Sequence, residues 1–580
     1  MDTGLKIYRN YFPIKFGTQF DARYGELYPV FRKIMYPGDV FKIHADLLIR
    51  YQPMLAPPMN DCVATVRFAF VPLRLVEGDT ELIVTGSNDG HLSTETLPVM
   101  DSVFKYLTAG TGKAVNQKHS LLDYMCDIPA ISTDLTSELK TKLEASKSVP
   151  AAYFPKAYYR FWWDYYRDEN LFTEFTDFDD FWDSMKTKLN LSEGSLMYAN
   201  LKKDRITSAL PWQLKAVAAP RIPINVSGTF SGGSTTFNLG RATAENRYTD
   251  LISNNTVDVD KFDIKGIYNP ASGSPNPFVD AGPSGGGEWT PEGQLAAYNA
   301  FTERMENALN NNTLTGAVSN IDTVGIAQSE IRDVGALTRI YERLARCGSR
   351  YTEYLYANFG VAPRDDTLQR AQYLGGFKTR IVTTEVVQTA GAGDNPVGTL
   401  RGHGITHGTQ TIKPFMAKEI GVIVGVLDIK PETIYAQGVD RELTARSRFD
   451  FMNPSFQHLS EQEVRKGEIY FDVDTDTDGN LKNDETFGFQ PYGQELRRGI
   501  KHVNGDMRDS LSFWNQALIF SERPSLNQAL IRSTSHLANY NRPFNVSGSD
   551  AYPMVIDFGG LIEAYRPLVK DGTPGLFDHN

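Results

Sequence analysis

The chain has 580 residues, of which 41% are hydrophobic and 22% are charged, a balance typical of a globular protein with a large core. Its formal net charge of -11 at pH 7 argues against a protein that wraps nucleic acid with its whole surface, because such proteins carry a broad basic excess. Cys62, Cys126 and Cys347 lie far apart in the sequence, which fits neither a disulfide framework nor a paired metal-ligand motif. The chain has no basic segment followed by a long apolar run, so we expect neither a secretory signal nor a membrane span.

The segment from Leu27 to Leu75 predicts a series of β-strands. It contains runs rich in Val, Ile, Phe and Tyr, such as VFKIHADLLIRYQ and CVATVRFAFVPLRLV, divided by PGD and PPMND turn signals. In the second run Ala64, Val66, Phe68 and Phe70 share one face, as expected for a half-buried strand. Strand-like runs return later in TRIVTTEVVQT and EIGVIVGVLDI. A sheet protein is therefore expected.

Two helices are predicted among these strands. The segment FPKAYYRFWWDYYRDENLF has Pro155 in a first helical turn. Its aromatic residues recur at spacings of three and four, at Tyr158, Phe161, Trp162, Tyr165 and Tyr166. Packing in the core or between subunits is favoured over a base-stacking or cofactor platform. The second helix is predicted across SEIRDVGALTRIYERLARCG, where apolar residues form one stripe and Gly348 ends it.

Composition divides the chain into three parts. Residues 1–224 hold an N-terminal arm, the first strands and the aromatic helix, and residues 324–580 hold the second helix, the remaining strands and a C-terminal arm. Between them, residues 225–323 are rich in Gly, Ser, Asn and Pro, as in GTFSGGSTTFNLG and NPASGSPNPF. So long an irregular stretch predicts an exposed functional insertion within one domain.

The strongest local pattern is DTDTDGNLKNDE, which matches the spacing of a calcium-binding loop. Loop positions one, three, five, six, seven and twelve are Asp474, Asp476, Asp478, Gly479, Asn480 and Glu485. The preceding EIYFDV reads as a strand, whereas an EF-hand needs a helix there. A bound calcium ion and a solvated acidic turn therefore both stay open.

Basic residues gather in QELRRGIKHVNGDMR, where Arg497, Arg498, Lys501 and Arg508 are candidates for contacts with DNA phosphates. A solvated basic surface is the alternative. His403 and His407 are four apart in the glycine-rich RGHGITHG, so we expect surface-loop histidines and no zinc pair. GPSGG around Ser284 resembles a nucleophile elbow, but it lies in a Pro/Gly-rich loop, so no such chemistry is expected.

Further motifs occur in an order that points to one family. The N-terminal third has LYPVFRKIMYPGDVFKIHADLLIRYQPMLAPPMNDCVATVRFAFVPLRLV, and the middle has SLLDYMCDIP, FPKAYYRFWWDYYRDENL and LPWQLKAV. Later come RYTEYLYANFGVAPRDDTLQRAQYLGG, YAQGVDRELTARSRFDFMNPSFQHLSEQEV, AYRPL and GTPGLFDH. Together they resemble the major capsid proteins of the Microviridae, most of all the gokushovirus branch, over nearly the whole chain outside residues 225–323.

The resemblance implies an eight-stranded antiparallel jelly roll, the viral capsid β-sandwich, with long loop and helical insertions. It implies sixty copies in a T=1 icosahedral shell around circular single-stranded DNA, with no catalytic residue. Residues 225–323 would form a protrusion at the threefold axes and a candidate host-attachment site. The implied partners are further copies of the chain, the genome, an internal scaffolding protein, a DNA pilot protein, a small basic DNA-packaging protein and a host surface receptor. The chain would be made in the bacterial host cytoplasm and reside in the virion.

Two interpretations from other classes compete with the capsid. One is a secreted carbohydrate-active β-sandwich with a calcium site, in which paired carboxylates hydrolyse a glycosidic bond. The other is a calcium-dependent, lectin-like binding module. The first is disfavoured, because we expect no signal sequence and find no carboxylate pair suited to hydrolysis. Both predict a monomer or small oligomer instead of a closed shell.

Overall fold

The computed structural model describes residues 9–85, 99–109, 114–215, 328–347, 350–387, 389, 397–398, 400–448, 450–456, 461–545 and 551–570. The chain divides into two units, Met1–Ala219 with Arg339–Asn580, and Pro220–Thr338. In the second unit only residues 328–338 are described. The predicted insertion at residues 225–323 therefore lies outside the described residues, and its exposure and role stay predictions.

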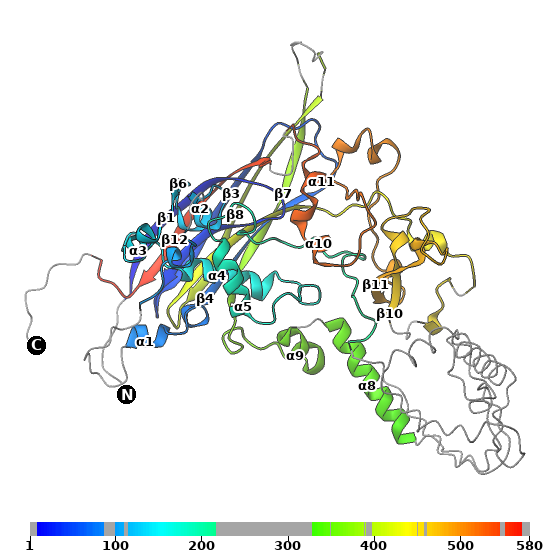
Figure 1. Cartoon of the computed structure of the whole chain (residues 1–580), viewed down its shortest axis with the longest axis horizontal. Coiled ribbons are helices and arrows are strands. Elements are labelled where there is room, and N and C mark those ends of the chain that lie inside the picture. Colours follow the sequence, from blue (N-terminus) through cyan, green and yellow to red (C-terminus); the bar gives the residue numbers. More distant parts are fainter. Residues whose placement is uncertain are drawn as a thin grey trace, which may run out of the picture. The chain divides into compact units, whose positions relative to one another are not determined.

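The first unit is built on an antiparallel sheet of eight strands, in the order β1-β12-β3-β8-β7-β4-β9-β2 (Figure 1). The strands are β1 (Asn10–Ala22), β2 (Leu27–Met35), β3 (Val40–Tyr51), β4 (Cys62–Pro72), β7 (Gln372–Val387), β8 (Leu400–Met416), β9 (Gly421–Pro431) and β12 (Met554–Arg566). The order alternates segments from both ends of the chain, so the sheet forms only when distant segments meet.

Strand β7 joins two four-stranded halves of this sheet. Its first part pairs with β4, and its last part, Val382–Val387, pairs with Leu400–Ile405 of β8. One half is then β1-β12-β3-β8 and the other is β7-β4-β9-β2, with a shared core that contains side chains from both. The predicted eight-stranded antiparallel jelly roll is confirmed.

Two connections between strands carry the insertions. Between β4 and β7 lie the small β5 (Ala114–Asn116) and β6 (Ile131–Asp134) and most of the helices, and between β9 and β12 lie β10 (Glu461–Arg465), β11 (Thr486–Pro491) and short helices. The helices are α1 (Thr80–Thr85), α2 (Leu121–Cys126), α3 (Ser137–Glu144), α4 (Tyr153–Tyr165), α5 (Phe178–Met185), α8 (Gln328–Cys347), α9 (Tyr351–Phe359), α10 (Gln528–Ile531) and α11 (Leu537–Asn541). Both predicted helices are present, as α4 and α8.

The burial of the strands follows their sequence patterns in part. In β3 the inward residues Phe41, Ile43 and Leu47 are buried and alternate with more exposed neighbours, as a strand with one face on the core requires. The half-buried pattern predicted for β4 is wrong, because Thr65 and Ala69 on its other face are buried as well. Helix α4 contacts β4 and β9, and this layer covers the face that the alternation predicts to be exposed.

The segment RGHGITHG is also corrected, because it lies within β8 and not in a surface loop. His403 and His407 both point outward, and residues four apart in a strand are separated by roughly 13 Å, so they do not converge on one ion. The glycines of the segment face inward, where other segments of the same chain approach closely. A Cβ atom on Gly404 would overlap the ring of Tyr51. Glycine is thus used here for its lack of a side chain, not for a loop conformation.

Replacing Gly404 with alanine tests this close approach. The added methyl group must displace Tyr51, a ring that is only 6% exposed, so the free energy of unfolding should fall by about 1–3 kcal/mol. Chemical denaturation of the full chain measures it. The matched control is Gly499→Ala, whose new Cβ would meet no atom within 4 Å. Equal stability of the two variants would contradict the proposed packing.

Candidate functional site

The aromatic residues predicted for a core or subunit contact lie on or just after α4. Tyr158, Phe161 and Trp162 are fully buried, and Tyr166, the residue after the helix, is 7% exposed. Tyr165 is partly buried and packs against the same core. The ring of Trp162 stacks on Phe181 of α5, with centroids 5.3 Å apart. The structure thus places Tyr158, Phe161 and Trp162 inside the subunit, and Tyr165 and Tyr166 on the lining of a cleft.

Hydrogen bonds at the polar tips of these rings fix α4 against the sheet. The hydroxyl of Tyr158 donates to the carbonyl of Leu27 at 2.7 Å, and Nε1 of Trp162 donates to the carbonyl of Tyr198 at 2.9 Å. Burial raises the pKa of Tyr158 well above its usual value, because the charged form would lose its water. These tyrosines are therefore neutral packing elements.

The acidic loop forms a turn around Asp476. The carboxylate of Asp476 accepts hydrogen bonds from the backbone N–H groups of Asp478 and Asn480, at 2.9 and 2.8 Å. These bonds hold the pKa of Asp476 below its usual value. Gly479 has φ +82°, which the sharp turn requires. The loop is thus closed by its own backbone donors.

The last predicted calcium ligand, Glu485, does not join Asp476 in this arrangement. Glu485 instead pairs with Lys466, Oε2 to Nζ at 2.6 Å. In the part of the chain that the structure describes, no three acidic, histidine or cysteine side chains gather as a metal ion would require. Calcium binding by Asp474, Asp476, Asp478, Asn480 and Glu485 stays a prediction that would need Glu485 to leave Lys466.

The four predicted DNA-contact residues separate into different environments. Lys501 forms an ion pair with Glu432, and Arg508 donates to Oδ1 of Asn504 at 2.8 Å. Arg497 and Arg498 are exposed after a short 3₁₀ turn. Of the four, Arg498 alone lines a cleft. The structure therefore does not assemble the four into one basic patch.

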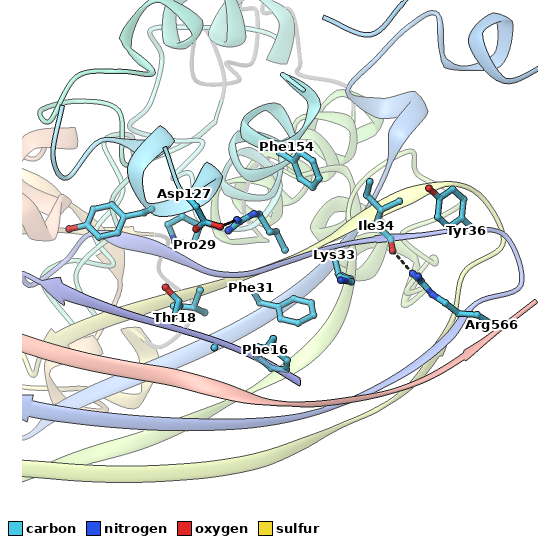
Figure 2. Close-up of a pocket in the computed structure, with 14 residues that line it drawn as sticks. Phe16, Thr18, Pro29, Phe31, Lys33, Ile34, Tyr36, Asp127, Phe154 and Arg566 are labelled. Atoms are coloured by element: carbon cyan, nitrogen blue, oxygen red, sulfur yellow. Dashed lines mark hydrogen bonds and ion pairs between the residues drawn. The ribbon is translucent and has the colours of Figure 1, made fainter. Parts of the chain in front are cut away.

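A cleft that sequence reasoning missed lies at the seam between the two edge strands, β1 and β2. It has a volume of about 520 Å³. Figure 2 shows Phe16 of β1 and Phe31 of β2 facing one another across it, with ring centroids 4.8 Å apart. The alternation of Phe12, Ile14 and Phe16 with outward neighbours is the sequence signal that predicts β1 and its inward face.

Charged side chains hold the rim of this seam cleft. Arg32 pairs with Asp127, the one acidic side chain among its described lining residues. Arg566 of β12 donates to the carbonyl of Ile34 in β2 at 2.9 Å (Figure 2) and pairs with the buried Asp39 at 3.2 Å. Because its only carboxylate is engaged, this lining supports packing or binding and offers no acid-base pair for catalysis.

Helix α9 presents an unusual exposed surface. Four of its nine residues are aromatic, and Tyr351, Tyr356 and Phe359 are each more than 60% exposed. None of the residues of α9 is buried. Exposed aromatic clusters are typical of protein contact surfaces, since they bury large areas at small entropic cost. The side chains of Tyr351, Tyr354, Tyr356 and Phe359 are called the α9 aromatic surface below.

Membrane insertion finds no support in the described part of the chain, where none of the helices has the length and apolar character of a bilayer span. Its one helix of 20 residues, α8, carries several charged side chains.

The comparisons with known proteins agree over nearly the full length. The family model described as Capsid protein (F protein) matches residues 3–576. The chain is 27% identical to Capsid protein VP1 of Chlamydia phage 1 over 96% of this chain and 94% of that protein. It is 26% identical to Capsid protein VP1 of Bdellovibrio phage phiMH2K, over 98% and 96%, and 26% identical to that of Spiroplasma virus 4, over 95% and 92%. The predicted resemblance is confirmed: the chain belongs to the phage capsid protein (F protein) family.

Proposed function

We propose that this capsid protein assembles as sixty copies into a T=1 icosahedral shell that encloses a circular single-stranded DNA genome. The observation that carries the proposal is the family match over residues 3–576, joined to a complete eight-stranded jelly roll. A jelly roll suits shell building because its two sheets bury one core while the connecting loops are free to make contacts. Two of its connections carry long insertions here.

The further roles rest on the resemblance. Residues 225–323 are proposed as the threefold protrusion and the host-attachment segment. An internal scaffolding protein, a DNA pilot protein and a small basic DNA-packaging protein are proposed as partners, and a basic partner would offset the net charge of -11. The proposed place of synthesis is the cytoplasm of the bacterial host, and the mature protein resides in the virion.

Subunit contacts are proposed to include the α9 aromatic surface. A shell protein needs surfaces that stay exposed in the single chain and become buried on assembly. Tyr356 and Phe359 are 67% and 65% exposed, so most of their apolar area is free for a contact with another copy. Many such contacts, each weak, sum to a closed shell.

Electron microscopy of the full chain, produced together with its proposed scaffolding partner, tests the function. Uniform icosahedral particles that protect single-stranded DNA from nuclease are expected. Small oligomers without nucleic acid in that preparation would contradict the shell. A glycan array would then test the lectin-like alternative.

The α9 aromatic surface is tested by the double substitution Tyr356→Ser with Phe359→Ser. We expect the yield of closed particles to fall at least several-fold, because each lost contact is repeated in every copy of a symmetric shell. The unfolding free energy of the unassembled chain should change by less than about 0.5 kcal/mol, since both side chains are exposed. Met59→Ser, at a side chain 75% exposed, is the control for lost apolar area. Normal particle yield would exclude α9 as a contact.

Calcium binding by the acidic loop is tested by particle melting with calcium and with a chelator. If the loop binds the ion, calcium should raise the melting temperature by several degrees, and Asp476→Ala with Glu485→Ala should abolish that difference. The quantity compared is the difference in melting temperature between the two buffers, because Asp476→Ala also removes turn hydrogen bonds and so lowers stability in both. Asp484→Ala, which changes a non-ligand acid of the same loop, should leave the difference intact. Identical melting of the wild-type particles in both buffers would remove the prediction.

A further inference from the structure

A second cleft, of about 640 Å³, has more basic than acidic side chains on its lining. Its lining comes from segments far apart in the sequence: strands β4 and β9, the loop after α4, residues 200–210, the junction of α8 and α9, and residues 491–498. The basic side chains are Arg67, Arg167, Lys203, Arg346, Arg350, Lys430 and Arg498. We call this feature the cationic cleft.

The carboxylates at the cationic cleft neutralise only part of this charge. Three acidic side chains, Asp168, Glu169 and Glu353, line it. Two buried carboxylates outside the lining also contact its cations. Oδ2 of Asp428 lies 3.4 Å from Nζ of Lys430, and Glu461 pairs with Arg346. Seven cations thus face five carboxylates, so the cleft is positive on a chain whose net charge is -11.

The excess of charge concentrates around two arginines that share one partner. Oε1 of Glu169 accepts from Arg167 at 3.2 Å and from Arg350 at 3.0 Å. Burial, together with the charge of Arg350, lowers the pKa of Arg167 from its ordinary value. Arg498, on the same lining, is exposed and forms no ion pair with a described residue. Arg167, Arg350 and Arg498 thus all present positive charge on the lining of this cleft.

Buried polar atoms on the same lining lack hydrogen-bond partners. They are Nε of Arg167 and the hydroxyl of Ser208. Tyr166 is 7% exposed, and the guanidinium of Arg67 lies over its ring at 5.0 Å. Buried donors without a partner are uncommon and costly. In this cleft the unpartnered donors lie on a lining with excess positive charge. An anion with several acceptor oxygens would accept their hydrogen bonds and neutralise that charge.

We propose that the cationic cleft binds a phosphate group of single-stranded nucleic acid, held by Arg167, Arg350 and Arg498. Arginine forks bind phosphate oxygens in pairs, and the hydroxyl of Ser208 supplies a further donor. The proposal rests on the proposed function, because the shell would bring this ligand to every copy. Binding is independent of base sequence, since Tyr166 is too buried to stack on a base. An acidic peptide is the other polyanion that could bind here, and the test must distinguish it from nucleic acid.

Arg498→Glu is the decisive substitution, because the side chain is exposed and its loss should not disturb folding. Binding of a fluorescent oligothymidylate to the full chain is measured by anisotropy at several salt concentrations. Relative to wild type, we expect affinity to fall about tenfold or more at low salt, and the slope of log affinity against log salt to shrink by about 0.7 for one lost phosphate contact. Arg50→Glu makes the same charge change at an exposed strand residue outside the cleft and should lower affinity less than twofold.

The remaining outcomes each decide against the proposal. Equal losses of affinity in Arg498→Glu and Arg50→Glu would indicate general electrostatic attraction and would overturn the cleft as the binding site. Displacement of the oligonucleotide by poly-glutamate at the concentration at which inorganic polyphosphate displaces it would assign the cleft to acidic peptides. If particles form and protect DNA while Arg498→Glu binds and packages it normally, the cleft proposal fails and the proposed function stands.

Discussion

The fold depends on closing an open sheet whose two edge strands, β1 and β2, do not pair through their backbones. The strand order ends on β1 and β2, and these two edge strands meet through side chains. Phe16 packs on Phe31, Phe20 packs on Tyr28, and Arg566 reaches across to the carbonyl of Ile34. Unpaired edges are a risk for uncontrolled pairing between chains. Aromatic packing at the seam therefore encloses the core, and it also leaves the cleft in which the two edges face each other.

The insertions extend this core outward. Helix α4 covers β4 and β9, so the central strands are buried on both faces, and the aromatic rings of α4 and α5 form a second packing layer. The polar tips of these rings bind backbone carbonyls, which fixes the layer in one position. A rigid platform of this kind lets the loops beyond it form clefts whose lining comes from many segments.

Charge is distributed unevenly over this platform. The chain is acidic overall, yet basic side chains from several distant segments meet on the lining of one positive cleft. A negative net charge keeps copies of a shell protein apart in solution, whereas a local positive site permits contact with a polyanion. The two properties are compatible in one chain because screening limits each charge to about 8–10 Å at physiological salt.

The sequence by itself determined the strands and helices with strong periodic patterns. The alternation in β3, the three-and-four spacing of aromatic residues in α4 and the ordered family motifs were each sufficient, because the periods of strands and helices are local properties of the chain. Only the tertiary structure decided which faces are covered. Thr65 and Ala69 are buried by a helix about ninety residues away, and Gly404 lies in a strand where Tyr51 packs against it. The pairing of Glu485 with Lys466 and the presence of Arg350 and Arg498 on one cleft lining depend likewise on contacts between segments apart in the sequence, which local pattern does not encode.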